Sequence, residues 1–336
     1  MTAPAEQGAT VAGQRAGEHG AGEPGGATAT AGAPPAAAVR GVRKVFGKTV
    51  AVDGIDLEVP TGAVLGMLGP NGSGKTTLIR MLLGLTRPTA GTAELLGHAV
   101  PDAAEHALPH VGALVEGPGF HPFLSGRENL RRVAATEPLL ATKAIPDAVG
   151  TALERVGLAD AADRRFRGYS LGMKQRLGLA SALLVPRRLV VLDEPTNGLD
   201  PAGTRDVRRI IAELHAGGAT VLVSSHLLAE VEATCTHVAV LQSGSLVASG
   251  ELGKLLEAGT GGLVVTTPDV DVALEALRGV GATAFREGDG IVVSDGGPPA
   301  PEIVALLVRA GVAVHEARRR RARLEELFAR LTEESP

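Results

Sequence analysis

The sequence predicts an α/β fold organised around a phosphate-binding loop, with antiparallel strands before it, a helical segment after it and a small α+β unit at the C-terminus. Three observations predict this fold. The glycine-rich segment 69–77 follows the apolar run 64–68, as a loop follows a buried strand. The apolar run 189–192 leads directly into two carboxylates. Apolar residues alternate with polar or glycine positions through residues 42–59, which is the period of half-buried antiparallel strands.

Length and composition limit the classes of protein to which the chain can belong. A chain of 336 residues predicts about two domains plus tails. The net charge of -4, the absence of Trp and the single Tyr argue against nucleic acid as a partner. Cys235 is the only cysteine, which excludes an internal disulfide and favours a reducing, cytoplasmic compartment. We expect no leader and no membrane span, so a role at a membrane needs a partner's spanning segments.

The N-terminal segment, residues 1–38, is rich in Ala, Gly, Pro, Thr and Glu and has almost no branched apolar residues. This composition does not repay the entropy of ordering, so we predict a disordered tail. Folding is expected to begin at Val39, where the strand-like alternation starts. Phe46 is the one aromatic residue between this point and the glycine-rich loop, and it is either a core residue or a ring that stacks on a nucleobase.

The glycine-rich segment fits the pattern G-x-x-x-x-G-K-[ST]. Its glycines let successive amide N–H groups point inward, where they and the N-terminus of the following helix hold a polyphosphate. Lys75 is expected to reach the β- and γ-phosphates, and Thr76 to place its hydroxyl on Mg²⁺. The alternative is a glycine-rich turn before an ordinary helix, but the strand ahead of the motif favours a bound nucleoside triphosphate. The predicted nucleotide-binding residues of this loop are Gly69, Pro70, Asn71, Gly72, Ser73, Gly74, Lys75, Thr76 and Thr77.

Two predicted strands end in polar side chains that suit phosphate chemistry. Asp193 follows strand 189–192, whose C-terminal end faces the phosphate loop, and is expected to hold the Mg²⁺ shell. Glu194 is then placed to accept the proton of an attacking water. His226 follows strand 220–224, where it contacts a γ-phosphate or positions the water; without these neighbours it would be an ordinary loop histidine.

A third predicted strand, 111–116, ends in the carboxylate of Glu116. The loop after it contains Phe120 and Phe123, and exposing two such rings to water is unfavourable. These rings are therefore expected either to cover a partner surface or to fold inward. Residues 125–168 are predicted to be helical and to open with a capping box, because Glu128 stands three residues after Ser125.

The segment that opens helix 177–184 contains Ser170 and Gly172, which form an anion site by the same amide physics or simply cap the helix. A helix over 204–214, a hairpin of strands 238–242 and 245–248, and a closing helix over 251–257 complete the larger unit.

The C-terminal unit, residues 262–336, is predicted to have the order β-α-β-β-α-β, ending with a strand at 312–314. A last helix over 318–331 carries the apolar stripe Leu324, Leu327, Phe328 and Leu331 after four consecutive arginines. The arginines either touch lipid headgroups or nucleic acid, or form a solvated helix face beside a docking stripe.

Taken together, the phosphate loop, the serine-glycine helix start, the Asp-Glu strand end and the strand-end histidine resemble the motif set of ATP-binding-cassette (ABC) ATPases, a branch of the P-loop NTPases. The resemblance covers residues 39 to about 256. It implies ATP and Mg²⁺ as ligands, and it implies roles for Phe46 in stacking on adenine, Asp193 in metal binding, Glu194 as general base and His226 as γ-phosphate switch. Asp200 resembles the residue of the dimer-contacting D-loop, and Ser170 and Gly172 resemble the two retained positions of the signature motif.

Two positions depart from the family pattern. Residues 169–173 read Tyr-Ser-Leu-Gly-Met where the family has Leu-Ser-Gly-Gly-Gln. Glu116 stands where the family usually has the glutamine that senses the metal, and its carboxylate is expected to bind Mg²⁺ directly or through water.

The resemblance further implies a head-to-tail pair of ATPase subunits that drives a separately encoded membrane permease from the cytoplasmic face of the membrane. The loop around Glu116 and the C-terminal unit are similar to those of bacterial drug, bacitracin and lantibiotic exporters, so export is expected. The domains are then a tail at 1–38, an ATPase domain at 39–257 and an accessory domain at 262–336. Import, or a soluble ATPase acting on ribosomes or DNA, remains the alternative.

Overall fold

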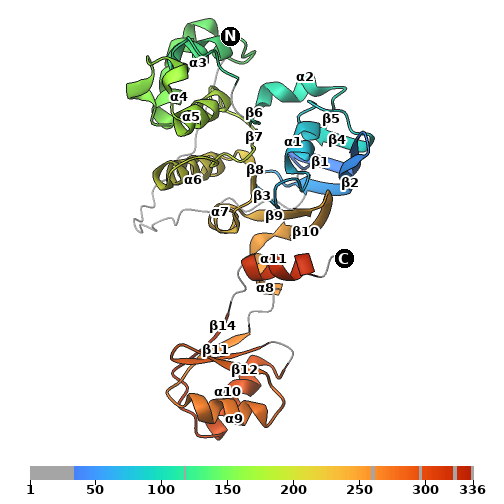
Figure 1. The fold of residues 1–336 in the computed structure, drawn as a ribbon, viewed down its shortest axis with the longest axis vertical. Helices are drawn as coiled ribbons and strands as arrows, with labels where there is room; N and C mark the ends of the chain where they lie inside the picture. The colour runs from blue at the N-terminus through green and yellow to red at the C-terminus, as the bar shows by residue number, and fades with distance from the viewer. Residues whose placement is uncertain (1–33, 117–118, 259–261, 295–296, 321–323, 334–336) are drawn as a thin grey trace, which may run out of the picture.

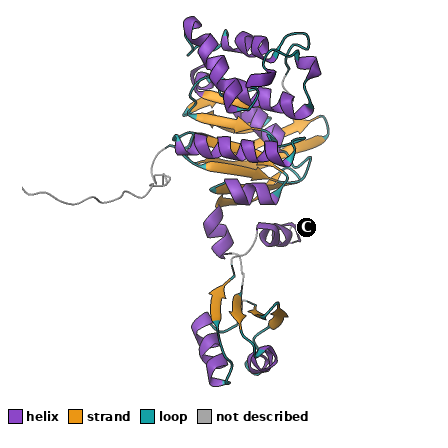
Figure 2. Ribbon diagram, turned by 90° about the vertical axis from the view of Figure 1, so that its left-hand side faces the viewer, coloured by secondary structure: helices purple, strands orange, loops and turns teal. Residues whose placement is uncertain are grey.

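The computed structural model describes residues 34–116, 119–258, 262–294, 297–320 and 324–333. These residues form three β-sheets, two of which belong to one layered body while the third stands apart from it (Figures 1 and 2). Most of the predicted N-terminal tail, residues 1–33, lies outside the described residues.

The first sheet is antiparallel and has the strand order β2-β1-β4-β5. Its strands are β1 (Ala37–Phe46), β2 (Thr49–Val59), β4 (Ala90–Leu95) and β5 (His98–Val100). Ala37 and Ala38 pair with β2 on one side and β4 on the other, and their side chains are buried. The ordered chain therefore begins before Val39, because small alanines fit between two flanking strands even though they carry no strand-like alternation.

The central sheet has the order β10-β9-β3-β8-β7-β6. Strands β6 (Val111–Leu114), β7 (Leu189–Leu192), β8 (Thr220–Ser225), β3 (Val64–Leu68) and β9 (His237–Gln242) run parallel, and β10 (Ser245–Glu251) closes the predicted hairpin. The C-terminal ends of the parallel strands share one edge of the sheet, where ligands bind in open α/β folds.

Each face of the central sheet has its own core. Successive residues of one strand, such as Val190 and Val191, enter opposite cores because their side chains point to opposite faces of the sheet. One core packs against the helices that follow β6, and the other packs against α1 (Lys75–Leu82) and the first sheet. The phosphate-loop helix is thus fixed between two sheets.

The remaining helices of this body are α2 (Ala104–Ala107), α3 (Gly126–Ala134), α4 (Ile145–Arg155), α5 (Leu171–Ala182), α6 (Pro201–Ala216), α7 (Leu228–Thr234) and α8 (Leu252–Ala258). The predicted capping box is confirmed, since Ser125 and Glu128 each satisfy the other's backbone N–H. Helix α5 begins at Leu171, six residues before the predicted start, because the Ser170 hydroxyl accepts the N–H of Met173 and caps it.

The third sheet is antiparallel and has the order β12-β13-β11-β14, with α9 (Val270–Arg278) and α10 (Ala300–Arg309) between its strands in the chain. The predicted β-α-β-β-α-β order is found. Its strands are β11 (Leu263–Thr266), β12 (Ala284–Glu287), β13 (Gly290–Val293) and β14 (Glu316–Arg319).

Two C-terminal predictions are wrong. The last strand lies at Glu316–Arg319, not at 312–314, and the last helix is α11 (Leu324–Glu333), not 318–331. Arg318 and Arg319 therefore belong to a strand, since they pair with Val264 and Leu263 of β11. Cross-strand pairing outweighs the apolar alternation on which the prediction rested; the fourth arginine, residue 321, lies outside the described residues.

Helix α11 returns from the small sheet to the layered body (Figure 1). Leu324 is fully buried in the core that also contains Val231 of α7 and Leu252 of α8. Its backbone N–H donates to the carboxylate of Glu232, also on α7. Leu324, Leu327 and Phe328 of the predicted docking stripe therefore pack within the chain, on the body that contains the helix after His226.

Candidate active site

The candidate site is built at the edge where β3, β7 and β8 end. The register pairs Leu68 with Ser225, and Leu192 with Val223, so the segments after all three strands start side by side. Because the strands are parallel, groups that are more than 100 residues apart in the sequence converge on one edge.

The phosphate loop ends in a conformation that only glycine adopts readily. Gly74 has φ +101°, and a Cβ there would lie 2.6 Å from the carbonyl oxygen of Ala51. Lys75, the next residue, is buried, and its ammonium donates to the carbonyl oxygens of Gly69 at 2.7 Å and Pro70 at 3.2 Å. The loop thus curls around its own lysine.

This cradle fits a polyphosphate. Helix α1 has no side-chain cap and no acidic residue in its first turn, so its N–H groups and dipole are left for an anion. The hydroxyl of Ser73 is buried and makes no hydrogen bond with the described residues. Thr76 and Thr77 stand in the first turn of α1. The oxygens of a triphosphate would accept hydrogen bonds from these N–H and hydroxyl groups.

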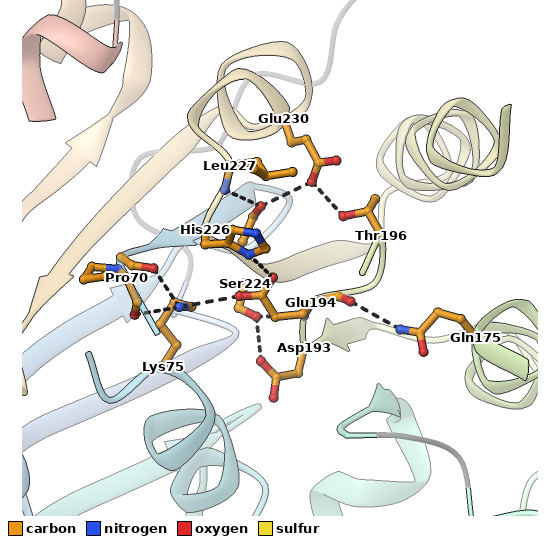
Figure 3. A network of polar contacts seen from close by, with 12 residues as sticks. Pro70, Lys75, Gln175, Asp193, Glu194, Thr196, Ser224, His226, Leu227 and Glu230 are labelled. Atoms are coloured by element: carbon orange, nitrogen blue, oxygen red, sulfur yellow. Dashed lines mark hydrogen bonds and ion pairs between the residues drawn. The ribbon is translucent and has the colours of Figure 1, made fainter. Parts of the chain in front are cut away.

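The hydroxyl of Ser224 joins the two carboxylate residues of β7 (Figure 3). It donates to Oδ1 of Asp193 at 2.6 Å and accepts the backbone N–H of Glu194 at 2.8 Å. Ser224 is fully buried and Asp193 nearly so. One hydroxyl from β8 therefore fixes both residues, and Oδ2 of Asp193 remains for a cation.

The carboxylate of Glu194 lies between the phosphate loop and the strand-end histidine. Its Oε2 is 2.8 Å from Nδ1 of His226, and its Oε1 is 3.5 Å from Nζ of Lys75. Oε1 is buried and makes no hydrogen bond with the described residues, because 3.5 Å is an ion-pair distance rather than a good hydrogen bond. Such an oxygen suits the acceptance of a proton from a water molecule.

A second hydrogen-bond network lies beside the first and holds the loop that carries His226 (Figure 3). Glu230 of α7 accepts hydrogen bonds from the hydroxyls of Thr196 at 2.7 Å and Ser225 at 3.2 Å. Ser225 in turn accepts the N–H of Leu227 at 3.0 Å. His226 therefore stands on a loop held from both sides.

Glu116 ends on the neighbouring strand edge, but its carboxylate is engaged elsewhere. Its backbone has φ +59°, and Oε1 lies 2.5 Å from the guanidinium of Arg80 on α1. Strand β6 is joined to the end of β7 through the N–H of Asp193, which donates to the Leu114 carbonyl at 2.7 Å. Glu116 thus follows the strand beside β7, and its carboxylate is paired with a cation of the chain itself.

The serine-glycine segment contacts a different part of the chain. A Cβ at Gly172 would lie 3.2 Å from Leu199, and one at Gly198 would lie 2.4 Å from Leu171. Figure 1 shows α5 and α1 on different sides of the strands β6 to β8. The two predicted phosphate-binding segments of one chain therefore do not face each other.

The comparisons with known proteins agree with this geometry. Residues 52–197 match the family described as ABC transporter. The chain is 37% identical over 307 residues to the daunorubicin resistance ATP-binding protein DrrA3 of Streptomyces coeruleorubidus, which covers 89% of this chain and 96% of that protein. It is 35% identical over 291 residues to the bacitracin transport ATP-binding protein BcrA of Enterococcus faecalis, covering 86% and 93%.

The chain belongs to the ABC transporter ATP-binding proteins. Its fold is that of a solved ATP-binding subunit of an ABC transporter, with a TM-score of 0.60 and 26% identity over 66% of this chain and 92% of that one. The predicted fold class and family resemblance are confirmed. The chain is therefore an ATPase whose reaction drives transport. No helix among the described residues is long and apolar enough to cross a membrane.

The structure of this ABC ATPase brings together four of the predicted side chains, those of Lys75, Asp193, Glu194 and His226. Phe46 lies apart from this cluster at the end of β1, 51% exposed, with the ammonium of Lys44 5.0 Å from the ring centroid. Half of the residue's surface is exposed, so the core alternative for Phe46 is wrong.

Sequence reasoning missed four residues that hold this ABC site in shape: Arg80, Gln175, Ser224 and Glu230. None of these four side chains belongs to a motif that the sequence analysis used, so only tertiary contacts reveal them. One signal was available for Ser224, because this polar residue follows an apolar run and stands two residues before His226.

Proposed function

We propose that this chain is the ATPase subunit of an exporter and works as a head-to-tail dimer on a separately encoded membrane permease. The observation that carries the proposal is the division of the site. Lys75, Asp193, Glu194 and His226 converge on one edge (Figure 3), whereas Ser170 and Gly172 stand at the N-terminus of α5, and α5 and α1 lie on different sides of the strands β6 to β8 (Figure 1). A second protomer that presents its α5 N-terminus would complete the cage around ATP.

The proposed reaction is the attack of water on the γ-phosphorus of ATP. Glu194 accepts a proton from the water as the new P–O bond forms, and the bond from the γ-phosphorus to the bridging oxygen breaks, leaving ADP and phosphate. Lys75 neutralises the β- and γ-phosphate oxygens, and His226 holds both the Glu194 carboxylate and the γ-phosphate. Phe46 stacks on the adenine ring.

The proposed metal ligands are the Thr76 hydroxyl and the Asp193 carboxylate, with Glu116 in reach on the next strand edge. Hard oxygen donors of this kind suit Mg²⁺, which usually keeps several waters and takes its other ligands from substrate phosphates. When bound, Mg²⁺ supplies electrostatic stabilisation of the charge on the γ-phosphoryl group. A site with few protein ligands is what Mg²⁺ usually has. The described residues contain no group of three or more His, Cys, Asp or Glu that would hold a metal alone.

Export as the direction of transport is supported by the similar bacitracin and daunorubicin proteins. The cargo class proposed on this basis is a drug, antibiotic or peptide. Location at the cytoplasmic face of the membrane follows from the need for ATP and a permease. We also propose that the chain comprises an N-terminal tail, an ATPase domain that extends to residue 257 and an accessory domain at 262–336. The predicted boundary between 38 and 39 moves toward the N-terminus, because Ala37 and Ala38 already pair within the first sheet.

The test is co-expression with a membrane protein that is encoded nearby and has no ATPase of its own. The tagged chain is expected to copurify with that protein, and the pair is expected to raise the resistance of a sensitive host to bacitracin or daunorubicin. Lys75→Ala is the control, because it should keep the complex and abolish the resistance. Copurification with ribosomal RNA or DNA, or ATP-dependent uptake in place of efflux, would overturn the proposal.

A further inference from the structure

The backbone of Glu194 is held in a left-handed conformation, with φ +48°. A residue with a side chain adopts this conformation only where its surroundings enforce it. Its N–H donates to Ser224 at 2.8 Å, and its carbonyl oxygen accepts from the N–H of Asn197 at 3.1 Å and from Nε2 of Gln175 at 3.2 Å. Of these three partners of the Glu194 backbone, Gln175 is the one that comes from a helix, α5 (Figure 3).

Gln175 belongs to helix α5, the helix whose N-terminus begins at Ser170. The side chain is half-buried and crosses from α5 to the end of β7. The start of α5 also touches the loop after Glu194, because Leu171 lies against Gly198 and Leu199 lies against Gly172. The helix is therefore joined to the loop of Glu194 at two separate points.

A helix transmits small displacements along its axis as a rigid element. Ser170 and Gln175 are separated by about 7.5 Å along α5, at about 1.5 Å per residue. A displacement of the Ser170 end of the helix reaches Gln175 with little loss. The Glu194 peptide, which is strained and bonded directly to Gln175, is the group that such a displacement would reorient.

We propose that Gln175 is a positioning residue that makes the orientation of Glu194 in one ATP site depend on what helix α5 binds at the other site. The inference rests on the proposed head-to-tail dimer, in which Ser170 of one protomer lies on the ATP held by the Lys75 loop of its partner. ATP at the partner's site fixes α5, and the amide of Gln175 then fixes the peptide of Glu194 in its own site. Hydrolysis at the two sites is coupled through this one hydrogen bond.

The amide must act as a donor, because the Glu194 carbonyl only accepts. Gln175→Glu keeps the length and shape of the side chain but replaces the donor by a carboxylate at neutral pH. Gln175→Ala removes the side chain. If Gln175 served only to fill space, the glutamate variant would behave as wild type and the alanine variant would not.

The experiment measures ATP hydrolysis against ATP concentration for the full-length protein and three variants. Wild type is expected to show a Hill coefficient clearly above 1. Gln175→Ala and Gln175→Glu are expected to lower kcat about 3- to 10-fold, the rate equivalent of one neutral hydrogen bond, and to bring the Hill coefficient to 1. The Kd for ATP is expected to stay within about twofold of wild type, since no phosphate contact is lost. Ser181→Ala, on the same helix and bonded only to Gly178 of its own helix, is the matched control and should match wild type.

A pH profile provides a second readout. The carboxyl introduced by Gln175→Glu regains a donor when it is protonated, so the activity of this variant relative to wild type should rise as the pH falls from 7 toward the ordinary glutamate pKa of about 4.3. A structural role would leave that ratio constant. Wild-type kcat and cooperativity in both Gln175 variants, or a Hill coefficient of 1 in wild type, would overturn the inference.

Glu194→Gln separates this result from the proposed function. If Glu194→Gln loses turnover while the Gln175 variants behave as wild type, the coupling is refuted and the assignment of the general base stands. If Glu194→Gln hydrolyses ATP at the wild-type rate, the proposed mechanism itself is refuted.

Discussion

The hydroxyl of Ser224 is the point at which β8 controls both carboxylate residues of β7. Ser224→Ala removes a hydrogen bond to Asp193 and the acceptor of the Glu194 N–H in one step. Both lost contacts are inside the protein, because Ser224 is fully buried. Alanine offers neither a donor nor an acceptor in place of the hydroxyl, and the pairing of β8 with β3 and β7 keeps residue 224 where it is.

The expected size of the effect follows from the charges involved. A hydrogen bond to a charged group contributes about 1.5–3 kcal/mol, so the misplacement of Asp193 is expected to lower kcat by about 10- to 150-fold if it is felt in the transition state. The orphaned N–H of Glu194 is expected to lower the free energy of unfolding by about 1–3 kcal/mol. Affinity for ATP should change less than kcat, since the phosphate loop keeps its donors.

The assays are steady-state ATP hydrolysis, ATP binding by titration calorimetry and urea unfolding, each with wild type, Ser224→Ala and Ser181→Ala. The control removes a hydroxyl that bonds only within α5. A kcat of Ser224→Ala within twofold of wild type, with an unchanged unfolding midpoint, would refute the assignment of Ser224 as the anchor of Asp193 and Glu194.

Three further predictions test other parts of the structure. Gly74→Ala should abolish ATP binding, whereas Gly72→Ala should have a milder effect, because nothing lies within 4 Å of the added Cβ. ATP affinity is measured by calorimetry. Equal affinity of Gly74→Ala and wild type would refute the assignment of this loop as the phosphate cradle. Burial raises the pKa of the Cys235 thiol to about 12, so it should not react with iodoacetamide at pH 8 until urea unfolds the protein, and rapid alkylation of the native protein would contradict its burial. Leu324→Ala should weaken the docking of α11 by about 2–5 kcal/mol and speed the amide hydrogen exchange of this helix. Leu139→Ala, at a half-exposed site, should leave that exchange unchanged. Equal exchange of α11 in the two variants would refute its docking.

The sequence predicted the parts of the fold that depend on local patterns. Apolar runs that enter glycine or carboxylate, such as 64–68 and 189–192, marked the strands β3 and β7 because buried parallel strands are continuous in hydrophobicity. The capping box at Ser125 was predictable because two side chains and two backbone groups at fixed spacing define it. The strand end at Asp193 was predictable because the apolar run 189–192 stops there at two carboxylates.

Features that depend on pairing between distant segments could not be predicted. Arg318 and Arg319 form a strand because β11 is there to pair with them, and nothing in their own sequence indicates it. Ala37 and Ala38 are ordered for a similar reason. Within the site, the sequence predicted the strand-end groups Asp193, Glu194 and His226 but not the contact of Gln175, which joins α5 to the end of β7.

The central claim is that the strand-edge groups around Lys75 bind ATP and that a second copy of the chain completes the site. The most direct measurement is the mass in solution of Glu194→Gln, by light scattering, with and without Mg²⁺ and ATP. The account predicts a monomer without nucleotide, and with Mg²⁺ and ATP a dimer that retains two ATP molecules and hydrolyses neither. A protein that binds ATP with full affinity and remains a monomer, or a dimer that still turns over, would contradict it.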